Sequence, residues 1–366
     1  MTSASLERLL IVSPNWLGDA VMALPALADV RRSFPSARLI VAARRAVASL
    51  FSMSPVVDEV LVLEWSGRFL ARGPRRQDVA RLRAVRANAA LLLPNSFASA
   101  WLAKRAGIRE RWGYAADMRR PLLSRAVVVP TIRSHQSEYY RHLVRELGVE
   151  DAPIGLPLEV PGPATREARE LLRANGWDEI RSLVVIAPGA AYGGAKRWPP
   201  EYYAQLATTL VRERSAHCAL VGSSADAATT AWVRALVPEA ARARVSDLAG
   251  ATTLDLLAGV MSLSRACVSN DSGAMHLAGA VGVPLVALFG PTRERETAPL
   301  GQPGRRVEVL VNHVWCRPCM LRECPLDHRC MKGLSPEKVL GTVTDLMLDP
   351  ESRIPSPESR VPDPEP

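Results

Sequence analysis

Short aliphatic runs alternate with amphipathic segments along most of this chain. The first run spans Leu9 to Val12, and after a turn-like SPNWLGD it is followed by a segment from Ala20 to Ser33 with apolar residues at helical spacing. The same pattern returns at RLIVAAR, 60–63 and 89–93. Alternating short strands and helices predict a parallel sheet covered on both faces, in which ligands bind beyond the carboxyl ends of the strands.

A proline-rich stretch interrupts the pattern, which then starts again. The residues from Asp151 to Ala164 include four prolines, which disfavour regular structure and indicate an interdomain connection. Strand-like and helix-like segments follow, in the order SLVVIAP, YYAQLATTLVRE, HCALVGS, AWVRALVPEA, ACVSND and VPLVALFG. We therefore predict an α/β protein with two facing, Rossmann-like, doubly wound domains and a central cleft, at 1–155 and 156–348. The proline-containing tail at 349–366 is expected to be disordered.

Composition fits such a protein. A length of 366 residues with 48 % hydrophobic and 23 % charged content is ordinary for a cytosolic chain of two domains. The N-terminus has an acidic residue where a secretory signal would be basic, and the apolar run from Leu277 to Gly290 is too short to span a bilayer. Six cysteines without a signal peptide indicate reduced thiols. We expect a cytoplasmic location.

Positive charge is concentrated in one short stretch. The formal charge is +9, and a run opposed only by Asp78 contains Arg68, Arg72, Arg75, Arg76, Arg81, Arg83 and Arg86. Such a region attracts anions, and nucleic acid, an anionic membrane face or a phosphorylated glycolipid would satisfy it equally. A solvated helix face is the alternative interpretation.

The loop SPNWLGD is the first candidate for chemistry. Gly18 permits a ligand to approach the backbone, and Asp19 places a carboxylate near the start of the following helix. At a strand end that carboxylate could take a proton from an acceptor hydroxyl. A simple helix N-cap is the alternative.

A second candidate is SNDSGAMH, at 269–276. Small polar residues and Gly273 at a helix start present N–H groups to an anion, and the GPT loop at 290–292 adds a second small-residue loop at the same sheet edge. The alternative is that Asp271 or Ser272 merely caps the helix.

A third candidate is the glycine-rich loop PGAAYGGAKRW, which follows a strand and begins at Pro188. Its glycines and Lys196 precede a predicted helix start, which indicates a diphosphate site with the lysine countering the charge of a leaving group. In the alternative interpretation the lysine is simply solvated.

Four cysteines gather near the end of the chain. They lie within fifteen positions, around His328, and are Cys316, Cys319, Cys324 and Cys330. Such a cluster suits a structural zinc or an iron–sulfur site, although the spacing is not a common paired-knuckle pattern. A metal-free, reduced cluster packed against the domain is the alternative.

Together these segments resemble glycosyltransferase family 9, the bacterial lipopolysaccharide heptosyltransferases, over nearly the whole chain except the tail. The likeness is strongest at NWLGDAVMALPAL, LLLPNSFASAWLAKRAGIRERWGY, KRWPPEYYAQLA, SNDSGAMHLAGAVGVPLVALFGPT and CRPCMLRECPLDHRCM. The LPNSF segment and the cysteine-rich close look most like the heptosyltransferase II branch.

The resemblance implies a GT-B fold, with an acceptor domain followed by a domain for ADP-L-glycero-β-D-manno-heptose. The implied acceptor is heptosyl-Kdo2-lipid A at the inner face of the cytoplasmic membrane, with no nucleic acid as partner. Asp19 matches the family's base. The implied donor-binding residues are Gly189, Lys196, Asp226, Asp271, Ser272, Gly273 and His276, with Asp226 slightly shifted from the acidic residue that meets the ribose. The implied acceptor-binding residues are Asn15, Asn95, Ser96, Arg119 and Arg120.

The implied reaction is a single inverting displacement in which Asp19 removes the acceptor proton. A diphosphate leaves as a stable anion, so Lys196 and the amides at 271–273 would suffice to stabilise it. No DxD-like carboxylate pair is apparent in a matching loop, so we expect no catalytic cofactor and, at most, a structural zinc at the cysteines.

Three other functions remain open on the sequence. They are a family 9 enzyme with another heptose acceptor, a nucleotide-sugar epimerase of GT-B architecture, and a basic nucleic-acid-binding protein with a cysteine cluster. The last leaves the nucleotide-type loops unexplained.

Overall fold

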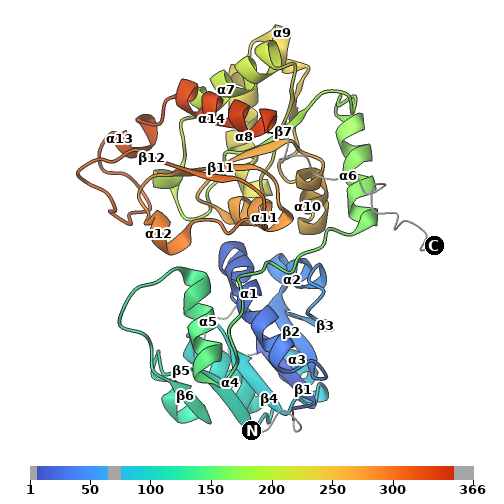
Figure 1. Cartoon of the computed structure of the whole chain (residues 1–366), viewed down its shortest axis with the longest axis vertical. Helices are drawn as coiled ribbons and strands as arrows, with labels where there is room; N and C mark the ends of the chain where they lie inside the picture. Colours follow the sequence, from blue (N-terminus) through green and yellow to red (C-terminus); the bar gives the residue numbers. More distant parts are fainter. Residues whose placement is uncertain (1–5, 65–75, 350–366) are drawn as a thin grey trace, which may run out of the picture. The chain divides into compact units, whose positions relative to one another are not determined.

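The computed structural model describes residues 6–64 and 76–349, which fall into two compact units (Figure 1). Unit 1 comprises residues up to Pro161 together with 293–300, and unit 2 comprises 162–292 and 301 onwards. The last residues of the predicted connection, from Gly162 to Ala164, already belong to a helix. Pro163 stands in the first turn of that helix, where a missing N–H breaks no hydrogen bond.

Unit 1 is a six-stranded parallel sheet in the order β3-β2-β1-β4-β5-β6. Its strands are β1 (Arg8–Val12), β2 (Arg38–Arg44), β3 (Glu59–Leu63), β4 (Ala89–Leu92), β5 (Glu110–Tyr114) and β6 (Arg125–Val127). Its helices are α1 (Leu17–Ser33), α2 (Arg45–Ser52), α3 (Arg76–Ala84), α4 (Phe97–Arg105), α5 (Gln136–Glu146) and the short α12 (Glu294–Thr297), with a 3-10 turn η2 (Arg120–Leu122).

The strand order places a topological switch point between β1 and β4. β1 pairs with β2 on one side and with β4 on the other, with Leu10 beside both Ile40 and Ala90. Crevices form at such a point, outside the carboxyl ends of the strands. The loops after β1 and β4 are therefore where unit 1 is expected to bind a ligand.

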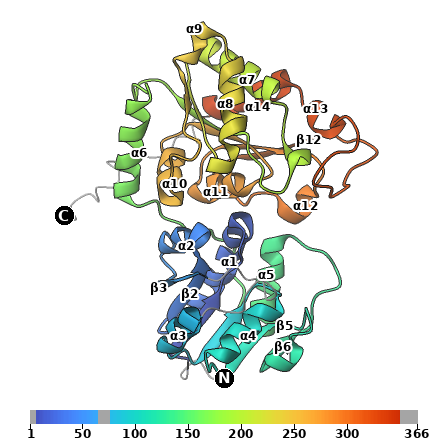
Figure 2. The ribbon, with the colours of Figure 1, turned by 180° about the vertical axis from the view of Figure 1, so that it is seen from behind.

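Unit 2 repeats the architecture with the strand order β12-β11-β10-β7-β8-β9. Figure 2 labels its helices, among them α6, α8 and α10, and its edge strand β12. Its strands are β7 (Leu183–Ala187), β8 (His217–Leu220), β9 (Val245–Asp247), β10 (Ala266–Asn270), β11 (Leu285–Phe289) and β12 (Val307–Val311). Its helices are α6 (Gly162–Ala174), α7 (Pro200–Glu213), α8 (Ala227–Leu236), α9 (Glu239–Arg242), α10 (Leu254–Ser262), α11 (Gly273–Val281), α13 (Arg329–Lys332) and α14 (Pro336–Leu348), with 3-10 turns η3 (Gly194–Lys196) and η4 (Ser224–Asp226). Here the switch point lies between β7 and β10.

Each sheet has helices on both of its faces. In unit 1, α1 packs against α2 and α5, whereas α3 packs against α4 on the opposite face. In unit 2, α7 packs against α8 and α14, and α10 packs against α6 and α11. The central strands β1, β4, β7, β10 and β11 are buried almost throughout, as their continuous aliphatic runs require. The predicted α/β fold of two doubly wound domains is confirmed.

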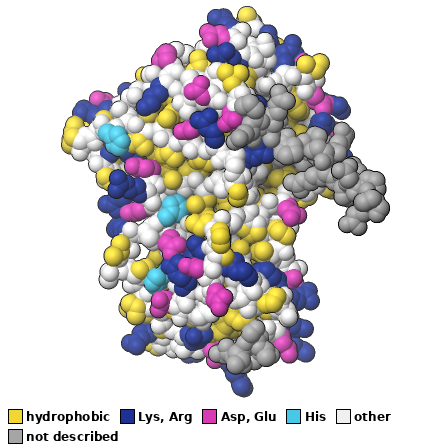
Figure 3. Space-filling model, viewed as in Figure 1, with side chains coloured by type: hydrophobic (Ala, Val, Ile, Leu, Met, Phe, Trp, Pro, Cys, Tyr) yellow, Lys and Arg dark blue, Asp and Glu magenta, His cyan; other side chains and the backbone are white. Residues whose placement is uncertain are grey.

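The arginine-rich stretch lies only partly within the described residues. Arg68, Arg72 and Arg75 fall outside them, whereas Arg76, Arg81, Arg83 and Arg86 are exposed on or just after α3. Lysine and arginine side chains are spread over the face drawn in Figure 3 and do not form one continuous patch there. In the part of the chain that the structure describes, no helix is both long and apolar enough to cross a membrane.

Candidate functional site

An open pocket of about 260 Å³ lies at the switch point of unit 1. It collects residues from the loops after β1 and β4, from the start of α1 and from α5. The lining residues are Pro14, Asn15, Trp16, Asp19, Leu93, Pro94, Asn95, Gln136, Tyr139 and Tyr140. Three residues singled out from the sequence, Asn15, Asp19 and Asn95, thus line one pocket.

Asp19 is not the N-cap of α1. Trp16 occupies that position and makes no side-chain capping hydrogen bond, so the capping alternative for Asp19 is wrong. The carboxylate lies in the first helical turn, where the helix dipole favours negative charge. Asp19 is partly exposed at the pocket wall, so its carboxylate is accessible to a ligand there.

α5 supplies a wall of this pocket that the sequence did not predict. Gln136, Tyr139 and Tyr140 follow the i, i+3, i+4 spacing of one helix face. Tyr140 is only 4 % exposed, and both its burial and the negative charge of Asp19 raise the pKa of its phenol above the ordinary value. Trp16, by contrast, is 62 % exposed and offers an aromatic face at the pocket.

Arg119 lies beneath the pocket instead of inside it. Its side chain is fully buried, and burial lowers the pKa of its guanidinium to about 10. The guanidinium donates to the backbone oxygens of Tyr114 (2.9 Å) and Pro94, and lies 3.4 Å from Asn95 Oδ1. Asn95 in turn donates to the Tyr139 hydroxyl at 2.7 Å. Arg119 therefore organises the pocket wall from a fully buried position.

Two other predicted acceptor residues stand apart from this pocket. Ser96 is the N-cap of α4, and its hydroxyl accepts from the Ser99 backbone N–H at 3.3 Å. Arg120 is exposed in η2. Neither residue lines the pocket that contains Asp19.

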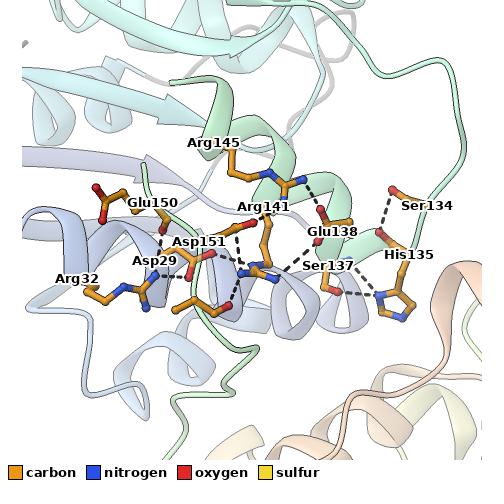
Figure 4. A network of polar contacts seen from close by, with 11 residues as sticks. Asp29, Arg32, Ser134, His135, Ser137, Glu138, Arg141, Arg145, Glu150 and Asp151 are labelled. Atoms are coloured by element: carbon orange, nitrogen blue, oxygen red, sulfur yellow. Dashed lines mark hydrogen bonds and ion pairs between the residues drawn. The ribbon is translucent and has the colours of Figure 1, made fainter. Parts of the chain in front are cut away.

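A network of charged residues fastens α5 to α1, as Figure 4 shows. At its centre the Arg141 Nε donates to Asp29 Oδ2 at 2.8 Å, and the two side chains are 7 % and 3 % exposed. Arg32 also pairs with Asp29, and Asp151 bridges Arg141 and Arg145. The pair holds together the two helices that carry Asp19 and Tyr140. It went unnoticed in the sequence because its members are far apart in the chain.

In unit 2, three loops at the carboxyl edge of the sheet converge on Asp271. Its Oδ2 lies 2.5 Å from Lys196 Nζ and accepts from the Thr292 hydroxyl at 2.6 Å. These residues come from the loops after β10, β7 and β11. The Lys196 side chain is 12 % exposed and its ammonium lies 4.7 Å from the centre of the Tyr192 ring, so the interpretation as a merely solvated lysine is wrong.

The start of α11 lies beside this ion pair. Ser272 occupies the N-cap without a side-chain capping hydrogen bond, and Gly273 begins the helix, which leaves the first N–H groups without a cap from that hydroxyl. Such an end attracts anions. His276, three residues into the helix, is only 3 % exposed. Asn270, the residue before Asp271, accepts a hydrogen bond from the Tyr203 hydroxyl at 2.8 Å.

Gly189 and Asp226 lie against each other across the ends of β7 and β8. A Cβ added to Gly189 would stand 2.5 Å from the Asp226 carboxylate, so a larger residue there would push that carboxylate aside. One carboxylate oxygen of Asp226 accepts from the Ser223 N–H at 3.0 Å and from its hydroxyl at 2.7 Å. The structure thus brings both predicted donor residues to the same sheet edge.

The cysteine cluster does not fit a metal ion. All four thiols are free; Cys319 is exposed, Cys330 is buried, and Cys316 and Cys324 are intermediate. Over residues 6–64 and 76–349, no group of three or more His, Cys, Asp or Glu residues could hold a metal. Burial and the charges of the other three cysteines raise the pKa of the Cys330 thiol. The expectation of a structural zinc at Cys316, Cys319, Cys324 and Cys330 is therefore not supported.

Comparison with known proteins matches residues 75–329 to the profile of glycosyltransferase family 9 (heptosyltransferase). The chain belongs to glycosyltransferase family 9. Lipopolysaccharide heptosyltransferase 2 of Escherichia coli (strain K12) is 31 % identical to this family 9 chain, over 94 % of this chain and 100 % of the relative. Lipooligosaccharide heptosyltransferase 2 of Haemophilus ducreyi is 30 % identical, over 83 % of this chain and 89 % of the relative.

Solved structures of the family share the fold of this glycosyltransferase. The E. coli ADP-heptose lps heptosyltransferase II superposes with a TM-score of 0.80 at 29 % identity, over 93 % of this chain and 98 % of that one. A family 9 glycosyltransferase from Veillonella parvula gives 0.78 at 21 % identity, over 93 % and 97 %. Family membership makes this chain an enzyme of glycosyl transfer, which sets aside the epimerase and nucleic-acid-binding hypotheses.

Proposed function

We propose that this family 9 glycosyltransferase transfers L-glycero-D-manno-heptose from ADP-heptose to the heptosyl-Kdo2-lipid A inner core in lipopolysaccharide biosynthesis. The observation that carries the proposal is similarity over nearly the full length of the chain, at 31 % identity, to a protein named lipopolysaccharide heptosyltransferase 2. The candidate sites at the switch points of units 1 and 2 support the proposal, because one offers a carboxylate and the other a lysine beside a helix N-terminus.

Unit 1 would hold the acceptor. Asp19 is a partly exposed carboxylate in an open pocket whose walls also present amides and aromatic rings. A carboxylate so placed removes the proton from the acceptor hydroxyl while that oxygen attacks the anomeric carbon of the donor. Attack from the side opposite the departing ADP inverts the anomeric centre in one step. Aromatic faces such as that of Trp16 suit the apolar side of a sugar ring.

Unit 2 would hold the donor. The ammonium of Lys196 and the N-terminus of α11 lie at one sheet edge, where they would face the diphosphate. Negative charge grows on the diphosphate as the glycosidic bond breaks, and both groups stabilise that charge without a proton donor. Asp226, against Gly189 at the same sheet edge, would receive the ribose hydroxyls.

We further propose a cytoplasmic protein that works at the inner face of the cytoplasmic membrane. Its acceptor is anchored there by acyl chains. The exposed arginines on α3, Arg76, Arg81 and Arg83, give it an attraction for anionic headgroups.

Acceptor-dependent release of ADP tests the function. The chain is incubated with ADP-heptose, with and without heptosyl-Kdo2-lipid A, in the presence of a chelator, and the product is weighed by mass spectrometry. We expect ADP only when the acceptor is present, and an acceptor heavier by one heptose. Isomerised sugar without acceptor would contradict transfer. Transfer only to a different core saccharide would show that this saccharide, and not heptosyl-Kdo2-lipid A, is the acceptor.

Replacing Lys196 by alanine is expected to lower kcat/KM for ADP-heptose about 10²-fold. The substitution removes the side-chain cation nearest Asp271 and leaves the developing charge of the diphosphate to the helix N-terminus alone. Steady-state kinetics at saturating acceptor measures the effect. Lys338→Ala, at an exposed position on α14, is the matched control and should match the wild type. Equal rates for the two variants would remove Lys196 from the donor site.

A further inference from the structure

The cysteine-rich segment, residues 315–329, lies against the proposed donor site. It follows β12 and ends at the start of α13. Although its thiols form no metal-holding group within the described residues, the segment touches both loops that position Lys196. Those loops are 189–197, after β7, and 290–292, after β11.

Three hydrogen bonds join the cysteine-rich segment to the glycine-rich loop. The Gly194 N–H donates to Glu323 Oε1 at 3.0 Å, and the Ala195 N–H donates to the Arg322 carbonyl at 2.9 Å. The Tyr192 hydroxyl donates to the Met320 carbonyl at 2.7 Å. The Gly194 and Ala195 amides are therefore already satisfied, so this loop would contact an anion through side chains such as that of Lys196 and not through these two amides.

The fit between these two segments is close. A Cβ on Gly193 would lie 2.3 Å from the Arg322 carbonyl oxygen, and one on Gly194 would lie 2.6 Å from the Glu323 carboxylate. The Arg322 guanidinium stands 5.4 Å from the centre of the Tyr192 ring, the same ring over which Lys196 lies. Glycine at these positions lets the segment approach the loop that ends in Lys196.

Arg317 connects the same segment to the second loop. Its guanidinium donates to the backbone oxygen of Thr292 at 2.8 Å and to that of Gly290. The Met320 N–H donates to the Pro291 carbonyl at 3.0 Å. Thr292 is the residue whose hydroxyl holds Asp271, the partner of Lys196. One segment thus fixes the backbone on both sides of the ion pair.

We propose that Glu323 and Arg317 are positioning residues for the donor diphosphate, holding the two loops so that Lys196 and Asp271 keep their places before the donor arrives. The proposal rests on the proposed donor site of unit 2. Ordering a loop costs free energy, and a loop ordered during folding does not draw that cost from the binding of the ligand. Loss of either residue therefore weakens donor binding more than it slows the chemical step.

Glu323→Ala is the first test. We expect the KM for ADP-heptose, and the Kd for ADP measured by calorimetry, to rise about tenfold. The kcat and the KM for the acceptor should stay within about twofold of the wild type. Glu323→Gln keeps an oxygen that accepts from the Gly194 N–H, so it should recover most of the donor affinity. Glu239→Ala, on an exposed carboxylate of α9, is the control and should change nothing.

Arg317→Met is a second, independent test, because it removes the hydrogen bonds that hold the loop at 290–292. We expect the same rise in donor KM with kcat retained. If these variants lose kcat and melt at lower temperature while donor KM and ADP affinity stay at wild-type values, the segment only stabilises the fold and the inference is overturned. If the wild type does not transfer from ADP-heptose at all, the proposed function fails first, and the two failures are thereby distinguished.

Discussion

Replacing Asp19 by asparagine is expected to reduce kcat for heptose transfer by about 10³-fold or more, to the limit of detection. A positioned general base contributes about 10²–10⁴ in rate, and an amide of the same shape cannot accept the proton. Asp19 lines the unit 1 pocket, whereas the residues proposed to hold the donor all lie in unit 2. Affinity for ADP-heptose should therefore stay close to that of the wild type.

Product formation at saturating donor and acceptor gives the rate, and calorimetry with ADP-heptose gives the affinity. Asp345→Asn, which removes an exposed carboxylate from α14, controls for the loss of one negative charge. Activity of Asp19→Asn equal to that of the control would take the base role away from Asp19. A parallel loss of donor affinity would instead indicate that the substitution disturbs the donor site.

Substituting Arg141 by methionine should lower the free energy of unfolding by about 3–5 kcal/mol, the largest stability change that we expect. Asp29 is 3 % exposed, and removal of Arg141 leaves its buried charge with one remaining partner, the half-exposed Arg32. Arg141 also donates to Asp151 Oδ1 at 3.0 Å, and that bond is lost as well. Urea unfolding followed by fluorescence measures the change, with activity recorded on the folded protein.

A double variant separates the buried pair from its surroundings. Asp29→Leu combined with Arg141→Met removes both charges, so it should be more stable than Arg141→Met alone. Arg145→Met, whose side chain is 32 % exposed, should cost no more than about 1 kcal/mol. If Arg141→Met and Arg145→Met lower the free energy of unfolding equally, burial does not increase the contribution of the pair between Asp29 and Arg141 to stability.

Most of the strands that the sequence revealed are buried almost throughout, and the exception is β3, a partly buried edge strand. RLIVAAR corresponds to β2 over the same residues, and the run from Leu9 becomes β1. β5, β6, β9 and β12 were missed, and they lie toward the edges of the two sheets. Their sequences, such as ERWGY and VEVLV, mix polar with apolar residues because these strands are only partly covered, so a search for aliphatic runs passes over them.

The site residues follow the same logic. Asn15, Asp19 and Asn95 could be singled out because they follow strand ends, and the rule for parallel sheets places such loops together. Tyr140 could not, since only the packing of α5 against α1 brings it to the pocket. The burial of Arg119 could not be predicted from the sequence either. An arginine in a basic chain is expected to be exposed, and only the structure shows the backbone carbonyls that accept from this one.

The ion pair between Lys196 and Asp271 also affects which anions unit 2 would bind only weakly. The Asp271 carboxylate already neutralises the Lys196 ammonium, so a small anion such as inorganic phosphate must compete with that carboxylate for the ammonium. Such an anion makes few other contacts that could offset the competition. A nucleotide sugar adds contacts through its ribose, base and heptose. Inorganic phosphate and other small anions should therefore be weak inhibitors, and the spent nucleotide should leave more readily than it would from an unpaired lysine.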